Sequence, residues 1–168
     1  MGRVGIDDIE DLRSLRLDSG DRHELLAAQS ECTFTFTTAA GWPAGVIMSY
    51  LYEKDRFWLT AVRGRAHAEA LTRDPRVTIV VSNAGTSLAG RRMLAVRGVG
   101  LVRDDETIKR WFLPRFAARL APADPDRMVR LLDSPKRVVF EVRPVEIAVS
   151  HDSRKMPGDG RGGPPERA

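Results

Sequence analysis

The stretch VRGRAHAEALTRDPRVTIVVS, residues 62–82, holds the pattern that decides the fold. It opens with two arginines on either side of Gly64 and continues as a short alanine-rich segment, residues 65–72, which favours a two-turn helix. The residue before a proline avoids helical dihedral angles, so the helix should end at Asp74, immediately before Pro75. The run RVTIVVS is then apolar nearly throughout, which predicts a strand covered on both faces.

Three strand patterns precede this helix. The run CTFTFTT, residues 32–38, alternates, with Phe34 and Phe36 on one face and threonines on the other, which is typical of a half-buried strand. Residues 44–53 and 56–62 predict two further strands. Because the connections between the three are short, they predict an antiparallel meander.

Two more strand patterns follow the stretch. Residues 92–104 predict a strand that contains Gly98 and Gly100, and glycines inside a strand often mark a bulge or the close approach of another group. Residues 137–151 predict one long strand, or two strands joined at Pro144. The sum is six or seven mostly antiparallel strands with peripheral helices, a mainly β fold whose edges would be removed by closure into a barrel.

The length and composition fit a single domain, because 168 residues with 42% apolar content can bury one core. Helical patterns fall at residues 7–15, 22–29, 105–116 and 127–132. The third of these has an apolar stripe made by Ile108, Trp111, Phe112 and Phe116. We therefore expect a helical segment over residues 1–30, the barrel over 31–155, and a tail over 156–168 whose glycines, prolines and charges predict disorder.

The charge and cysteine content exclude several classes of protein. The formal charge is +4 and is carried mainly by arginine. The sequence contains no block of like charges, so we expect no nucleic-acid partner. No apolar run approaches the roughly 20 residues that a membrane helix needs, and the charged N-terminus does not resemble a secretion signal. Cys32 is the only cysteine, so no internal disulfide can form. These features predict a cytoplasmic protein.

The basic turn is the strongest candidate for a binding site. Arg63 and Arg65 stand at the turn, and His67 falls in the first turn of the predicted helix. Helix N-termini present free N–H groups to anions, and guanidinium groups add charge-assisted hydrogen bonds, so this segment suits a phosphate. The alternative is that both arginines are solvated turn residues. Neither a Walker loop nor a GxGxxG loop is present.

Histidine and tryptophan offer weaker candidates. His23, His67 and His151 are far apart in sequence and lack the spacing of a metal site, so we expect no metal. Trp42, Trp58 and Trp111 are expected in the core or at an interface, although Trp42, in a turn before a proline, could instead flank a flat ligand.

The segment RFWLTAVRGRAHAEALTRDPRVTIVVS, followed by RRMLAVRGVGLVRDDETIKRWF, resembles the pyridoxamine 5′-phosphate oxidase-like family of flavin-binding split β-barrels. The resemblance is carried by Gly64 in the turn, by the run DPRV at residues 74–77, and by the run GVG at residues 98–100 leading to Asp104. It covers roughly residues 31–149 and implies a six- to seven-stranded antiparallel split β-barrel.

The resemblance also implies a homodimer that holds FMN between its subunits. The flavin ring would lie along one strand and beside the end of the next, the phosphate would be held by the basic turn, and the partner subunit would contribute the start of a later strand. The implied cofactor-binding residues are Val46, Met48, Ser49, Leu59, Thr60, Ala61, Arg63, Gly64, Arg65, His67, Arg91, Arg92 and Met93. Where the family commonly has two basic residues this chain has Ala66 and His67, which leaves deazaflavin F420 as an alternative cofactor.

Two functions remain open at this point. The first is an FMN- or deazaflavin-dependent oxidoreductase acting on an unidentified small molecule, in which the cofactor carries the hydride and no side chain need act as an acid or base. The second is a non-catalytic protein that holds a flavin or a haem, with His67 or His151 as the haem ligand. Pyridoxamine phosphate oxidase activity itself is disfavoured, because no tryptophan follows Trp111.

Overall fold

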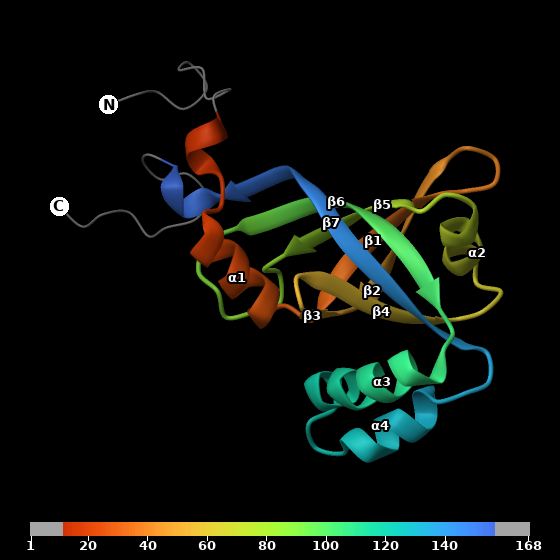
Figure 1. The fold of residues 1–168 in the computed structure, drawn as a ribbon. Helices are drawn as coiled ribbons and strands as arrows, with labels where there is room; N and C mark the ends of the chain where they lie inside the picture. The colour runs from red at the N-terminus through yellow and green to blue at the C-terminus, as the bar shows by residue number, and fades with distance from the viewer. Residues whose placement is uncertain (1–11, 157–168) are drawn as a thin grey trace, which may run out of the picture.

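The computed structural model describes residues 12–156, which form seven strands, four α-helices and two short 3-10 helices (Figure 1). The strands are β1 (Glu31–Thr37), β2 (Pro43–Ser49), β3 (Leu51–Glu53), β4 (Arg56–Val62), β5 (Arg76–Ser82), β6 (Arg92–Arg103) and β7 (Arg137–Asp152). The helices are η1 (Leu12–Leu15), α1 (Ser19–Ala28), α2 (Ala66–Arg73), α3 (Glu106–Leu120), α4 (Pro125–Leu132) and η2 (Ser153–Lys155). The predicted start of the first helix, at residue 7, and nearly all of the predicted tail lie outside the described residues.

All seven strands belong to one antiparallel sheet, in the order β2-β1-β5-β6-β7-β4-β3. This confirms the predicted mainly β fold. The two edge strands, β2 and β3, are consecutive in the chain and are separated only by Tyr50. The sheet must therefore curl until its two edges meet at that residue, which gives the half-barrel seen in Figure 1.

Tyr50 fixes this corner. Its side chain is fully buried, its hydroxyl donates to the carbonyl of Leu26 at 3.1 Å, and its backbone N–H donates to the carbonyl of Ser30 at 2.9 Å. The prediction of one strand over residues 44–53 was therefore wrong in detail. The first half pairs with β1 and the second half with β4, so the chain changes from one sheet edge to the other at Tyr50.

The glycines predicted to allow a close approach do so. An added Cβ at Gly98 would lie 2.7 Å from Val142 Cγ1 and 3.0 Å from the carbonyl oxygen of Arg143, at a bulge in the β6–β7 ladder. An added Cβ at Gly100 would lie 2.5 Å from Leu71 Cδ1. Gly100 is thus the position on β6 against which helix α2 packs.

Two hydrophobic cores lie on opposite faces of the β4–β7 ladder. The larger core fills the inside of the curled sheet and includes Phe34, Phe57 and Phe140. The smaller core packs helix α3 against the outer face, through contacts of Phe112 and Phe116 with residues of β4 and β7 that include Trp58 and Val139. The predicted apolar stripe of α3 therefore belongs to the core of the chain. Figure 1 shows α3 and α4 lying together below the sheet.

Two local expectations need correction. Strand β5 is not covered on both faces, because Thr78 and Val80 are only partly buried while Val77, Ile79 and Val81 are buried. Trp42 was expected in the core or at an interface; the core is excluded, since 74% of Trp42 is exposed in the β1–β2 turn, and a place at an interface or beside a flat ligand stays a prediction. Within residues 12–156, no helix is long and apolar enough to cross a bilayer.

Candidate functional site

The turn between β4 and α2 is built around Gly64. Its φ of +89° lies in the left-handed region, where glycine carries little steric cost. After this turn Arg65 is extended, with φ −72° and ψ 142°, and its N–H donates to the carbonyl of Val62 at 3.2 Å. The basic turn and short helix predicted from the sequence are confirmed as elements.

Helix α2 differs from the other three α-helices at its N-cap, the residue immediately before the helix. The N-caps of α1, α3 and α4 are Asp18, Asp105 and Asp124, and each of these carboxylates accepts a hydrogen bond from an N–H of the first turn. The N-cap of α2 is Arg65, whose side chain makes no capping hydrogen bond. The first N–H groups of a helix lack partners within the helix, so this terminus offers donors and a partial positive charge to an anion.

A groove of about 450 Å³ opens beside this terminus. It lies on the outer face of the β4–β7 ladder, where α2, the end of β2 and the α3–α4 pair come together. It is lined by Ile47, Met48, Ser49, Thr60, Ala61, Val62, Arg65, His67, Phe116, Leu120, Met128, Leu132 and Arg137. The charged and titratable side chains of the lining are all basic, and most of the remaining lining is apolar. Such a groove suits a ligand that has an anionic end and an apolar body.

His67 stands at the basic end of the groove. Its ring lies 6.2 Å from the ring of Phe36 and 5.8 Å from that of Phe140, centroid to centroid. Burial, together with the neighbouring Arg65 guanidinium, lowers the pKa of His67 below its ordinary value of 6.5. The imidazole is therefore neutral at pH 7 until an anion arrives to stabilise the charged form.

The groove brings together six of the residues implied by the resemblance, namely Met48, Ser49, Thr60, Ala61, Arg65 and His67. Four others lie nearby but do not line it. Val46 packs against the inner core, Leu59 is fully buried within that core, and Gly64 shapes the turn. Arg63 is paired with Asp104, its Nη2 lying 2.6 Å from Oδ2 of that carboxylate.

The remaining three implied residues are at the start of β6, away from the groove. Arg91 is exposed, Met93 is partly buried, and the side chain of Arg92 is only 3% exposed and is ion-paired with Glu24. The guanidinium of Arg92 is thus occupied within its own chain. Because these residues were assigned to the groove of a partner subunit, their role at the cofactor stays a prediction.

Sequence reasoning missed the wall formed by α3, α4 and the start of β7. Phe116 was assigned to an apolar stripe, and nothing near Arg137 in the sequence indicated a binding residue. Arg137 reaches the groove because it pairs with Val62 across the β4–β7 ladder, 75 residues away in the chain. Directly opposed residues of two strands project from the same face, so this pairing places Arg137 beside the basic turn.

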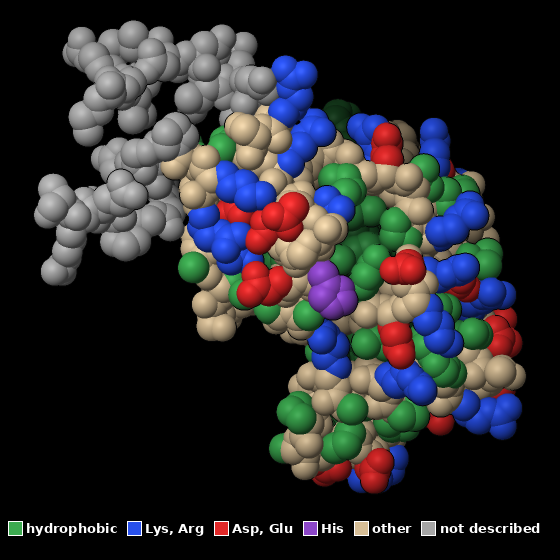
Figure 2. Space-filling view, turned by 60° about the vertical axis from the view of Figure 1, so that its left-hand side comes forward, with side chains coloured by type: hydrophobic (Ala, Val, Ile, Leu, Met, Phe, Trp, Pro, Cys, Tyr) green, Lys and Arg blue, Asp and Glu red, His purple; other side chains and the backbone are tan. Residues whose placement is uncertain are grey.

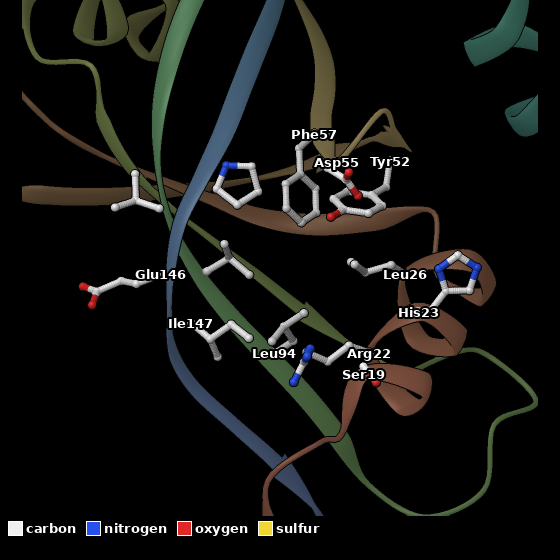
Figure 3. A pocket seen from close by; sticks show the side chains of 13 residues that line it. Ser19, Arg22, His23, Leu26, Tyr52, Asp55, Phe57, Leu94, Glu146 and Ile147 are labelled. Atoms are coloured by element: carbon white, nitrogen blue, oxygen red, sulfur yellow. The ribbon is translucent and has the colours of Figure 1, made fainter.

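A second cleft, of about 320 Å³, lies between α1, the β3–β4 turn and the middle of β6 and β7. Figure 2 shows a hollow floored by hydrophobic side chains, and Figure 3 shows Phe57, Leu94 and Ile147 facing this cleft from three strands. Its rim carries both signs of charge, from residues such as Arg22 and Asp55. None of the implied cofactor residues lines it, and the mixed rim does not select an anion. We therefore take the basic groove as the candidate site.

The fold and the groove together define a class, the split β-barrel with a basic groove on its outer face. Residues 22–151 match the sequence profile of the pyridoxamine 5′-phosphate oxidase family. That range is most of the chain, and the chain belongs to this family. Among curated proteins none matches the sequence.

Solved structures show the same fold. A conserved hypothetical protein of Mycobacterium tuberculosis superposes with a TM-score of 0.70 at 18% identity, covering 84% of this chain and 89% of that one. The haem storage protein HutZ of Vibrio cholerae gives a TM-score of 0.66 at 15% identity, covering 82% of this chain and 98% of that one. An F420 reductase gives 0.57 at 20% identity, covering 75% and 94%. At these identities the likeness establishes the fold alone.

Proposed function

We propose that this protein is a flavin-dependent oxidoreductase that binds FMN, or deazaflavin F420, in the basic groove of a homodimer and passes hydride to a small molecule. The main support for this proposal is the groove itself. Its lining contains basic side chains at one end, apolar residues along most of the rest, and no acidic residue. Family membership and an F420 reductase of the same fold support the choice of cofactor class.

The residues present fit such a cofactor. The side chain of Arg65 makes no hydrogen bond or ion pair within the described residues, so its guanidinium is available to a phosphate together with the uncapped terminus of α2. Met48 and Phe116 offer apolar surface to a flat ring. The hydroxyl of Thr60 donates to the carbonyl of Val138 at 2.8 Å, so its oxygen is left to accept a hydrogen bond from a ring N–H. The bound cofactor would supply the hydride chemistry, while these residues bind it and orient it.

An exposed apolar strand supports the dimer. Strand β4 pairs with β7 only as far as Val142, so within residues 12–156 the following part of β7 has a free edge on that side. On this part Val145, Ile147 and Val149 are 62%, 44% and 49% exposed. An apolar strand with a free edge associates readily with another chain unless it is covered. Sedimentation of the wild type as a dimer, and of Ile147→Lys as a monomer, would support a second copy as the cover.

The decisive experiment is the absorbance and mass spectrum of whatever co-purifies, followed by titration with FMN and F420. We expect flavin or deazaflavin bands, and bleaching of bound FMN by a reduced nicotinamide nucleotide. The double variant Arg65→Ala, His67→Ala should weaken binding by roughly 2–4 kcal/mol, because both side chains would contact phosphate. Arg76→Ala is the matched control, since Arg76 is exposed and paired with Asp74 outside the groove.

The outcomes separate the alternatives. Flavin bands that persist with reduced nicotinamide nucleotides would favour a non-catalytic carrier, and a Soret band in their place would favour a haem protein. Failure of the wild type to bind either flavin would refute the proposed function.

A further inference from the structure

Arg137 is a half-buried cation without an anionic partner. It begins β7, and its Nε donates to the carbonyl of Leu132 at 2.7 Å. Within residues 12–156 no carboxylate lies within ion-pair distance of its guanidinium, whereas the more deeply buried Arg92 is paired with Glu24. Burying a charge costs free energy unless an opposite charge compensates, so an unpaired guanidinium in this position needs an explanation.

The hydrogen bond to Leu132 holds this side chain in place. Leu132 is the last residue of α4, so Nε of Arg137 satisfies one of the carbonyls that a helix leaves free at its C-terminus. The two terminal nitrogens of the guanidinium retain their donors, and the side chain lines the groove that also contains Arg65 and His67. Burial lowers the pKa of Arg137, but arginine remains charged at any physiological pH.

We propose that Arg137 is a phosphate-binding residue of this groove, and that together with Arg65 it selects a ligand ending in a phosphate monoester. The inference rests on the proposed function and deepens it. Two permanent positive charges match the two negative charges of a monoester. His67 adds a third donor that becomes charged when the anion binds. Arg137 thus comes from the strand opposite β4, and compensates for Ala66, where the family commonly has a basic residue.

The test compares FMN with riboflavin, which has the same ring and lacks the phosphate. In Arg137→Met we expect the affinity for FMN to fall by about tenfold or more, and the affinity for riboflavin to change by less than about twofold. Arg137→Lys keeps the charge but loses the forked geometry, so it should recover only part of the FMN affinity. Arg130→Met is the control, because Arg130 is an exposed arginine of α4 outside the groove.

A second readout uses inorganic phosphate as the probe and needs no flavin. Millimolar phosphate should raise the thermal unfolding midpoint of the wild type and of Arg130→Met, and should raise that of Arg137→Met by clearly less, because Arg65 and His67 remain. Equal losses of FMN and riboflavin affinity in Arg137→Met would overturn the assignment, as would equal stabilisation of all three proteins by phosphate. If the wild type binds neither FMN nor F420, the proposed function fails, and the phosphate readout still decides whether Arg137 binds the anion. No stabilisation of the wild type by phosphate would then overturn the inference too.

Discussion

The contact between Leu71 and Gly100 should be the main anchor of helix α2 on the sheet. Leu71 is 3% exposed, and a Cβ added at Gly100 would lie 2.5 Å from its Cδ1 and 3.3 Å from its Cγ. Since Leu71 follows His67 by four residues in the same helix, the two side chains share one face of α2. The contact therefore fixes the position of the His67 side chain relative to the groove.

A double-mutant cycle measures this contact. Gly100→Ala overpacks the contact with Leu71, which should lower the free energy of unfolding by about 1–3 kcal/mol. About 0.5–1 kcal/mol of this is recovered through the lower entropy of the unfolded chain. Leu71→Ala alone opens a cavity and should cost about 2–5 kcal/mol. In the double variant the alanine Cβ occupies space that Leu71 has left, so the combined loss should be smaller than the sum by about 1–2 kcal/mol.

Urea unfolding followed by tryptophan fluorescence gives the four free energies. The control cycle pairs Leu71→Ala with Gly98→Ala, because Gly98 lies two residues away on β6 but faces Val142 and the backbone of Arg143. That control pair should be additive within about 0.5 kcal/mol. If the pair with Gly100 is equally additive, Leu71 does not rest on Gly100, and the placement of α2 is wrong.

Three further predictions concern titration and reactivity. Burial and Arg65 hold the pKa of His67 below 6.5, so the folded state binds fewer protons than the unfolded state. The free energy of unfolding should therefore decline as pH falls through about 6.5. In His67→Gln the free energy of unfolding should decline less over the same range. Burial opposes ionisation of Asp21, yet hydrogen bonds from Arg154 and Lys155 lower its pKa from 3.8 to about 2. The stability that the ionised carboxylate contributes at pH 5 should therefore be lost between about pH 4 and 2. In acid titrations followed by circular dichroism, Arg154→Ala should show a smaller loss over this range. Burial raises the pKa of Cys32 to about 12, so a thiol reagent at pH 8 should label the native protein far more slowly than the protein unfolded in urea; equal rates would contradict its burial.

The local elements could be predicted from sequence because their causes are local. The alternation in β1, the stop at Pro75 and the two glycines of β6 each depend on a few neighbouring residues, and the structure confirms them. The break at Tyr50 could not be predicted in this way, because a tyrosine between Ser49 and Leu51 continues a strand pattern as well as it ends one. Only the hydrogen bonds of Tyr50 to α1 and to the segment before β1 distinguish the corner.

The candidate site was half predictable for the same reason. Arg65 and His67 belong to one short segment, and the roles that we propose for them follow from a turn that precedes a helix. The position of Arg137 in the groove depends on which strand pairs with β4. Hydrophobic periodicity predicts which face of a strand a residue occupies, but it does not predict which strand lies next to it. The sequence left the core, an interface and a flat ligand open for Trp42 on the same grounds, because a large aromatic residue in a turn is buried only when that turn packs against something.

The basic end of the groove depends on strand register in a way that local sequence does not reveal. Arg137 stands opposite Val62, and the carbonyl of Lys136 accepts the N–H of Arg63 at 2.8 Å, so the first residues of β7 hold the start of the basic turn. A shift of one residue between β4 and β7 would turn Arg137 toward the inner core and would bring Val138 outward, because side chains alternate along a strand. The inner core resists such a shift, since Val138, Phe140 and Val142 would all leave it. The packing that stabilises the barrel therefore also sets the spacing of the cations that we propose bind the cofactor.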